Sequence, residues 1–97
     1  MWSKAIDRKF QVEPGRIWLA DAQGNTAAEV LFPDDGAGRV NITHTYVDDS
    51  LRGQGVAGKL METLTTELRR QGKRAKITCS YAADWFSRHP ENADILV

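Results

Sequence analysis

Hydrophobic and polar residues alternate along much of the first half of the chain. A period of two is typical of strands that bury one face. A turn is expected at Gly24 and Asn25, and another over residues 33–38, where proline, aspartate and glycine gather. The stretches read as strands are KFQVE, RIWLADAQGN, TAAEVLF and RVNITHTYV. They predict an antiparallel meander of about four strands.

The last of these stretches carries a regular alternation. It predicts one strand over residues 40–47 with two distinct faces. One face holds Val40, Ile42, His44 and Tyr46, and the other holds Asn41, Thr43, Thr45 and Val47.

From residue 55 the period lengthens from two to about four. Val56, Leu60, Leu64 and Leu68 recur at every fourth position, with polar side chains between them. This spacing predicts an amphipathic helix over residues 55–71. Gly72 is placed to end that helix in the left-handed conformation.

Two shorter elements follow the helix. AKITCS, residues 75–80, reads as a strand, and YAADWFSRH, residues 81–89, reads as a helix that Pro90 stops. The tail ADILV is apolar enough to pack or to add an edge strand. Strand 40–47, helix 55–71 and strand 75–80 form a right-handed βαβ unit with parallel strands. The prediction is one α/β (α+β) domain over residues 1–97: a meander, a βαβ unit and a short C-terminal helix.

Composition excludes several classes of protein. The 97 residues hold 13 basic and 13 acidic side chains, so the formal net charge is zero. This balance argues against a dedicated nucleic-acid or anionic-membrane binder. The single cysteine, Cys79, excludes an intrachain disulfide, and neither a signal peptide nor a membrane span is recognisable. We expect a cytoplasmic monomer or weak homodimer that needs no metal.

Glycines gather in LRGQGVAGKL, residues 51–60, between a predicted strand and the long helix. Gly53 and Gly55 leave the backbone bare where the first helix amides lack partners and the dipole is positive. Such a turn can hold a phosphate or pyrophosphate, with Arg52 adding a charge-assisted contact or bracing the loop. The alternative is a turn that only needs positive φ. The GxGxxG spacing does not indicate a dinucleotide-binding domain, because antiparallel strands precede it and the next strand ends at Cys79.

The segment Arg52–Ala57 resembles the Arg/Gln-x-x-Gly-x-Gly/Ala signature of the GCN5-related N-acetyltransferases (GNATs). The likeness covers about residues 27–97 and is strongest to a small YjdJ-like, or GNAT-domain-containing-protein-1-like, subgroup, through THTYVDDSLRGQGVAGKLM and CSYAADWFSRHPE. It implies a minimal GNAT fold that binds acetyl-CoA, with pyrophosphate on the signature and pantetheine in a V-shaped gap between the strands flanking the helix. The cofactor residues so implied are Thr45, Val47, Arg52, Gly53, Gln54, Gly55, Val56, Ala57 and Gly58.

Three residues are candidates for the chemistry of acetyl transfer. His44 could be the general base, and Tyr81 could protonate the leaving thiolate. Cys79 could be a nucleophile or a proton donor, with direct transfer favoured over an acetyl-cysteine. The structural alternatives are a hydrogen-bonded edge histidine and a small buried cysteine. Phe86 or Ser87 stands where many GNATs carry a general-acid tyrosine.

Two functions follow from this pattern. The first is an acetyl-CoA-dependent N-acetyltransferase whose amine acceptor is a small molecule or a protein. Its acceptor site should be open, because the chain has no room for the helices that many GNATs place between the first two strands. The second is a CoA- or acyl-CoA-binding module with little turnover, which the missing tyrosine favours. The basic run at residues 69–76 is interpreted as a solvated helix end.

Overall fold

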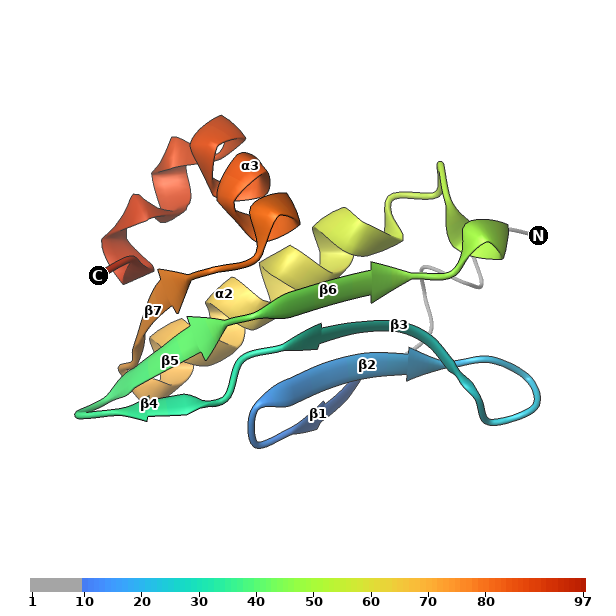
Figure 1. The fold of residues 1–97 in the computed structure, drawn as a ribbon, viewed down its shortest axis with the longest axis horizontal. Coiled ribbons are helices and arrows are strands. Elements are labelled where there is room, and N and C mark those ends of the chain that lie inside the picture. Colours follow the sequence, from blue (N-terminus) through green and yellow to red (C-terminus); the bar gives the residue numbers. More distant parts are fainter. Residues whose placement is uncertain (1–9) are drawn as a thin grey trace.

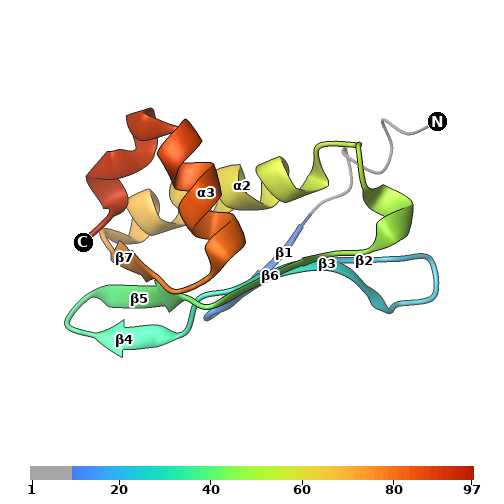
Figure 2. The ribbon, with the colours of Figure 1, turned by 45° about the horizontal axis from the view of Figure 1, so that its top comes forward.

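A computed structural model describes residues 10–97, so residues 1–9 of the predicted domain, with Lys9 of its first predicted strand, lie outside the described part. Strands form two small sheets, and the helices lie on one side of them (Figures 1 and 2). None of the described helices is long and apolar enough to cross a membrane.

The first sheet is antiparallel throughout. Its strand order is β1-β2-β3-β6. The second sheet has the order β4-β5-β7, with β5 antiparallel to β4 and parallel to β7. A meander feeding a βαβ unit was the predicted architecture, and the structure confirms it. The strands are β1 (Gln11–Glu13), β2 (Arg16–Ala20), β3 (Thr26–Leu31), β4 (Asp34–Gly36), β5 (Arg39–Ile42), β6 (His44–Val47) and β7 (Arg74–Ile77).

The predicted strand 40–47 is two strands, which part at Thr43. Leu31 pairs with His44 and also accepts the amide of Thr43 at 3.0 Å, so two residues oppose one, as in a β-bulge. One extra residue moves all later side chains to the other face of the sheet. Val40 and Ile42 are buried, whereas His44 and Tyr46 are exposed. The prediction that these four share a face was therefore wrong.

The second predicted turn is shorter than expected. Residues Asp34–Gly36 form β4, and the hairpin to β5 closes over residues 36–38. All three of those residues have positive φ, including Ala37 at 54°.

The long helix α2 (Val56–Gln71) begins within a residue of its predicted start. Its apolar stripe, including Leu60, Leu64 and Leu68, is fully buried against the sheets. Gly72 ends it with φ 68°, and its amide donates to carbonyls of the last turn, as predicted.

The C-terminal segment packs on α2 through α3 (Ser80–Arg88) and the 3-10 helix η2 (Pro90–Ile95). Arg69 of α2 holds Asp94 through both carboxylate oxygens, at 2.7 and 3.1 Å. The tail packs and also extends the sheet, because Ile95 is buried and Leu96 forms a parallel bridge with Ala75.

The face of the two sheets turned away from α2 and α3 is here called the outer face. In Figure 2 both helices lie on the opposite side. Among residues 10–97, no helix covers the outer face.

Candidate functional site: a cleft beside β6 and the start of α2

Strands β6 and β7 separate at the bulge. The pairing of β5 with β7 ends at Ile42 and Ile77, and the carbonyl of Ile42 then accepts the amides of Thr78 and Cys79 at 3.0 and 3.1 Å. Beyond that point β6 pairs with β3 alone among residues 10–97. Within this described part, one edge of β6 is therefore free, in the gap that the resemblance implied.

The backbone of Thr45 and Val47 faces this free edge. Just past the strand, the amide of Asp48 donates to the carbonyl of Ala27 at 2.8 Å. In an antiparallel pair only alternate residues bond to the partner strand, so His44 and Tyr46 bond toward β3. The backbone groups of Thr45 and Val47 point the other way, where they can bind an extended ligand.

The glycine loop provides open backbone at the start of α2. Gly53 and Gly55 have φ of 80° and 76°, and a Cβ on either would meet no heavy atom of the described residues within 4 Å. Among residues 10–97, no side chain caps the helix at Gly55. The first helical bond runs from the amide of Lys59 to the carbonyl of Gly55, so the amides of residues 56–58 lack partners in the helix. This arrangement fits a phosphate group.

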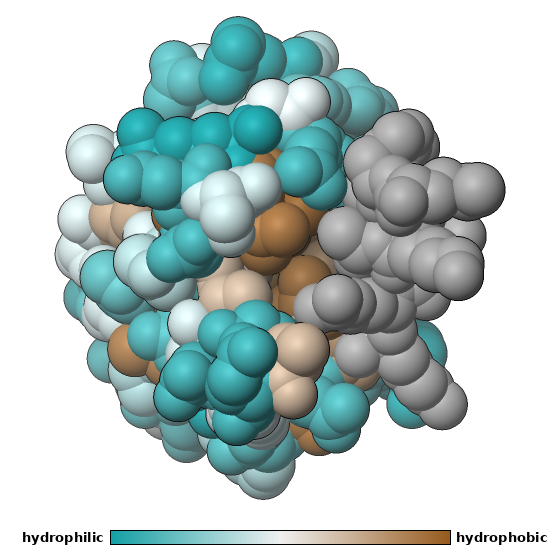
Figure 3. Space-filling view, turned by 90° about the vertical axis from the view of Figure 1, so that its right-hand side faces the viewer, coloured by the Kyte–Doolittle hydropathy of each residue, from teal (hydrophilic) through white to brown (hydrophobic). Residues whose placement is uncertain are grey.

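A cleft of about 480 Å³ joins the loop to the strand edge. Figure 3 shows the side of the molecule on which η1 lies, with apolar side chains gathered in a hollow among hydrophilic ones. All the predicted cofactor residues line the cleft except Gln54, whose amide side chain turns back to the carbonyl of Ser50 at 3.2 Å. Sequence reasoning missed Leu51, the apolar residue before the signature. The lining is Thr45, Val47, Leu51, Arg52, Gly53, Gly55, Val56, Ala57, Gly58 and Tyr81.

Asp48 shapes the short 3-10 helix η1 (Asp49–Leu51) that leads into the loop. Its carboxylate accepts the amide of Ser50 at 3.0 Å and the hydroxyl of Tyr46 at 3.1 Å. Hydrogen bonds from Ser50 and then Tyr46 lower the pKa of the Asp48 carboxyl. Arg52 pairs with exposed Asp49 at 3.0 Å, which places its charge at the rim of the cleft.

Cys79 lies behind Thr45, at the N-cap of α3. Its Sγ is 3.5 Å from Thr45 Oγ1. Burial raises the pKa of the Cys79 thiol, but hydrogen bonds from the backbones of Ala82, Tyr81 and Thr45 and from the Thr45 hydroxyl outweigh burial and leave that pKa lowered. The sequence could not give this environment, because Thr45 comes from another strand.

Tyr81, the second residue of α3, lines the cleft. Burial raises the pKa of its hydroxyl, with Asp84 and Cys79 adding to the shift and Arg88 opposing it. The phenol therefore keeps its proton at neutral pH.

His44 lies on the outer face, not in the cleft. Its side chain is 52% exposed, and Nε2 is 3.9 Å from Glu29 Oε2. Glu29 is 20% exposed and accepts a hydrogen bond from Arg16 Nε at 2.8 Å. The structure therefore brings Tyr81 near Cys79 and Thr45, but it places His44 on the other side of the sheet.

Gly58 serves packing as well as the cleft. A Cβ at this position would lie 3.9 Å from Nε1 of Trp85, the buried aromatic of α3. Trp85 also stacks on His89, with ring centroids 4.0 Å apart. A methyl group at Gly58 would therefore make ordinary contact with α3.

Comparison with known proteins agrees with this arrangement. Residues 16–95 match the family described as GCN5-related N-acetyl-transferase. A GCN5-like protein from Staphylococcus aureus, solved by NMR, has a TM-score of 0.77 at 25% identity, over 92% of this chain and 87% of that one. None of the curated proteins matches.

Larger relatives share the fold over part of their length. An acetyltransferase-like structure from Agrobacterium tumefaciens has a TM-score of 0.61 at 20% identity, over 82% of this chain and 57% of that one. For Tetrahymena GCN5 the TM-score is 0.59 at 10% identity, over 75% of this chain and 48% of that one. At these identities the likeness concerns the fold alone. Because the family match spans most of the chain, this protein belongs to the GCN5-related N-acetyltransferase family.

Proposed function

We propose that this protein is an acetyl-CoA-dependent N-acetyltransferase that acts on an amine. The observation that carries the proposal is one cleft that joins three features. These are the open amides at the start of α2, the free edge of β6, and Tyr81 together with Thr45, whose hydroxyl contacts Cys79. Acetyl-CoA, when bound, supplies the acetyl group as an activated thioester.

The chain offers a separate contact for each part of this cofactor. The amides of residues 56–58 and the positive end of the α2 dipole would hold the pyrophosphate. The backbone of Thr45 and Val47 would pair with the amides of the pantetheine arm, as an added strand would. Tyr81 and Thr45, which line the cleft, would lie closest to the thioester, and Cys79 contacts Thr45.

Proton transfer is divided between the two sides of the sheet. His44, on the outer face, takes the proton that the acceptor amine loses. Tyr81 is the better candidate to protonate the leaving thiolate, because its side chain lines the cleft and that of Cys79 does not. Cys79 as an acetyl-carrying nucleophile is the competing role, and direct transfer is preferred.

Calorimetric titration with acetyl-CoA tests the cofactor assignment. We expect a dissociation constant in the micromolar range, which corresponds to a binding free energy of about −8 kcal/mol. Inorganic phosphate should compete only weakly with acetyl-CoA for the cleft. The pantetheine arm should add to the affinity that the phosphates alone provide. No binding at millimolar acetyl-CoA would remove the basis for the proposal.

Turnover tests the chemistry separately. In Tyr81→Phe, acetyl transfer should fall while acetyl-CoA affinity stays within about twofold, because only the hydroxyl is lost. Ser87→Ala is the control, since that hydroxyl of α3 donates to the carbonyl of Asp84 and does not line the cleft. Equal rates in the parent and Tyr81→Phe would exclude Tyr81 as the acid.

A binding module without turnover is the second candidate. One observation favours it: His44 does not share a face with Cys79 and Tyr81. The double variant His44→Ala, Cys79→Ala decides between the two. An enzyme would lose turnover and keep its acetyl-CoA affinity, whereas a module would show negligible turnover before and after the change.

A further inference from the structure

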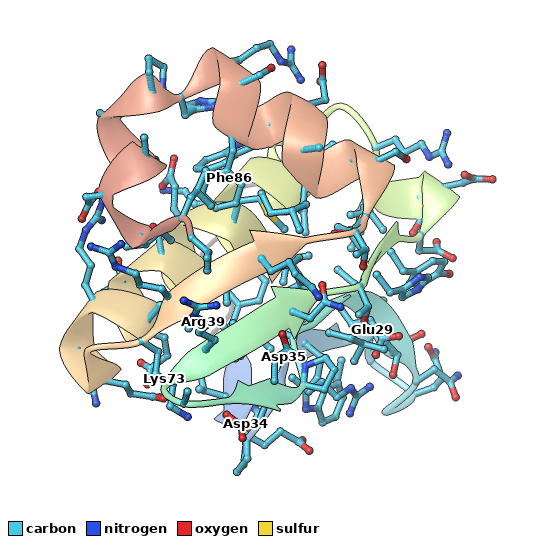
Figure 4. All side chains as sticks on the ribbon, turned by 60° about the vertical axis from the view of Figure 1, so that its left-hand side comes forward. Glu29, Asp34, Asp35, Arg39, Lys73 and Phe86 are labelled. Atoms are coloured by element: carbon cyan, nitrogen blue, oxygen red, sulfur yellow. The ribbon has the colours of Figure 1, made fainter. Side chains whose placement is uncertain are left out.

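The outer face of the two sheets forms one long surface with two kinds of charge. Across the first sheet, Trp18, Glu29 and Tyr46 occupy one row of paired residues. Arg16 and His44 lie in the next row. In Figure 4, Arg39, Asp35 and Glu29 follow one another along the molecule in this view.

The half around His44 is acidic and aromatic, and its groups are held in place. Arg16 donates to Glu29 and lies 4.4 Å from the centroid of the Trp18 ring. Trp18 Nε1 donates to Glu13 at 2.7 Å. Two carboxylates, Glu29 and Glu13, thus face one guanidinium, Arg16, beside His44. The net negative charge of this half attracts a positively charged amine.

The other half is basic. Arg39 of β5 pairs in register with Arg74 of β7, and both side chains are exposed on the outer face. Like charges directly across a sheet repel each other. Lys76, one pair further along, is matched by Asp35 at 3.7 Å.

Neither arginine has such a partner in the described part of the chain. No carboxylate forms an ion pair with Arg39 or Arg74 there. Arg74 helps to lower the pKa of Asp94, but that carboxylate is already bound by Arg69. Two adjacent guanidinium groups without a carboxylate partner can bind an acidic group from another molecule.

We propose that the acceptor is a polypeptide segment that lies extended along the outer face. Its amine reaches His44 and Glu29, and its acidic side chains bind Arg39 and Arg74. This inference rests on the proposed function, because it takes His44 as the base. Charge complementarity between the two halves of the face and such a segment carries it.

The spacing of the two halves sets the spacing in the acceptor. Arg39 and His44 are five residues apart along β5 and β6, and a strand rises about 3.3 Å per residue, or about 16 Å in all. An extended peptide would place its acidic side chains about four to six residues from the acceptor amine.

Three synthetic peptides of about thirteen residues, each with one central lysine, test this. The first carries two glutamates about five residues before the lysine, the second carries them about five residues after it, and the third has glutamines at all those places. We expect one acidic peptide to be acetylated with kcat/KM on the order of tenfold above the neutral peptide. Equal kcat/KM for all three would overturn the inference.

Charge-neutral variants locate the contact. In Arg39→Gln, Arg74→Gln the advantage of the acidic peptide should disappear, while the neutral peptide reacts as with the parent protein. Arg70→Gln, Lys73→Gln is the control, because it removes the same charge from the end of α2 and should keep the advantage. Loss of the advantage in both variants would show that the acidic peptide responds to the overall electrostatic field of the protein, and would overturn the assigned contact with Arg39 and Arg74.

Calorimetry with acetyl-CoA distinguishes a failure of this inference from a failure of the proposed acetyltransferase function. Both double variants should bind acetyl-CoA as the parent does, since neither pair lines the cleft. Normal acetyl-CoA binding with no preference among the peptides would reject the acceptor assignment alone. Absent acetyl-CoA binding in the parent would reject both.

Discussion

Cys79 illustrates how a single side chain takes its chemistry from distant parts of the chain. Its sulfur lies at the start of α3, yet the hydroxyl that approaches it belongs to β6. Burial favours the neutral thiol, while the hydrogen bonds favour the thiolate. The balance lowers the pKa of the thiol.

Alkylation measures this balance directly, because the chain has one cysteine. The rate with iodoacetamide should reach half its maximum at a lower pH than it does for a free cysteine. In Thr45→Val the lost hydroxyl contact should move that midpoint upward. Thr43→Val, at the exposed bulge, is the control and should leave it in place. An unchanged midpoint in Thr45→Val would contradict the assigned hydrogen bond.

Two glycines that line the cleft, Gly55 and Gly58, should respond oppositely to alanine. Gly58 is helical, and its added methyl would make ordinary contact with Trp85, so Gly58→Ala should stabilise the fold by about 0.5–1 kcal/mol. Gly55 has φ 76°, so Gly55→Ala should destabilise it by about 1–2 kcal/mol and weaken acetyl-CoA binding. Urea unfolding of both variants measures the contrast. A loss of stability in Gly58→Ala would show that α2 and α3 pack more tightly than described.

At the scale of elements, the link from β6 to α2 depends on Asp48. Asp48→Ala removes the acceptor for the Ser50 amide and the Tyr46 hydroxyl, so η1 should loosen and acetyl-CoA affinity should fall several-fold. Asp21→Ala is a matched control, because Asp21 accepts two backbone amides in the β2–β3 turn. Titration of both variants with acetyl-CoA compares the two turns. Equal affinities would mean that η1 does not organise the site.

Elements set by local spacing were predictable from the sequence. Helix α2 follows from its every-fourth apolar residues and from Gly72, and the loop follows from glycines with positive φ. The bulge at Thr43 was not predictable, because residues on both sides of it continue to alternate. Its position depends on pairing with β3 on one side and β7 on the other, which are distant in sequence.

The error about the bulge explains what was missed at the site. Most of the cleft residues were found because they belong to the signature, follow it directly or lie on the strand before it, although Leu51 beside it was missed. The face of the sheet on which His44 lies was predicted wrongly, because the bulge turns its side chain to the other face. The Glu29–Arg16 pair joins two strands and has no sequence signature.

At the scale of the whole molecule, Arg69 and Asp94 tie the C-terminal segment to α2. The hydrogen bonds from Arg69 lower the pKa of the Asp94 carboxyl in the folded state. A lowered pKa contributes stability above the unfolded value, and that contribution is lost as the pH falls below about 4. The parent protein should therefore lose stability on acidification.

Asp94→Asn tests this contribution. The variant should be less stable than the parent at neutral pH, and the difference should shrink toward pH 3. Thermal unfolding across this range measures it, with Asp84→Asn as a control carboxylate paired to Arg88 within α3. A constant difference at all pH values would show that the Asp94 charge is not the cause.

The bulge at Thr43 also has a kinetic consequence. It turns Thr45 toward one side of the sheet and His44 toward the other, so cofactor and acceptor approach from opposite sides without crossing each other's path. Under direct transfer neither has to bind first, and addition is expected to be random. Double-reciprocal plots of initial rate against acetyl-CoA concentration, measured at several acceptor concentrations, should then give intersecting lines. Parallel lines would instead indicate that acetyl-CoA reacts and CoA departs before the amine arrives, with Cys79 holding the acetyl group in between.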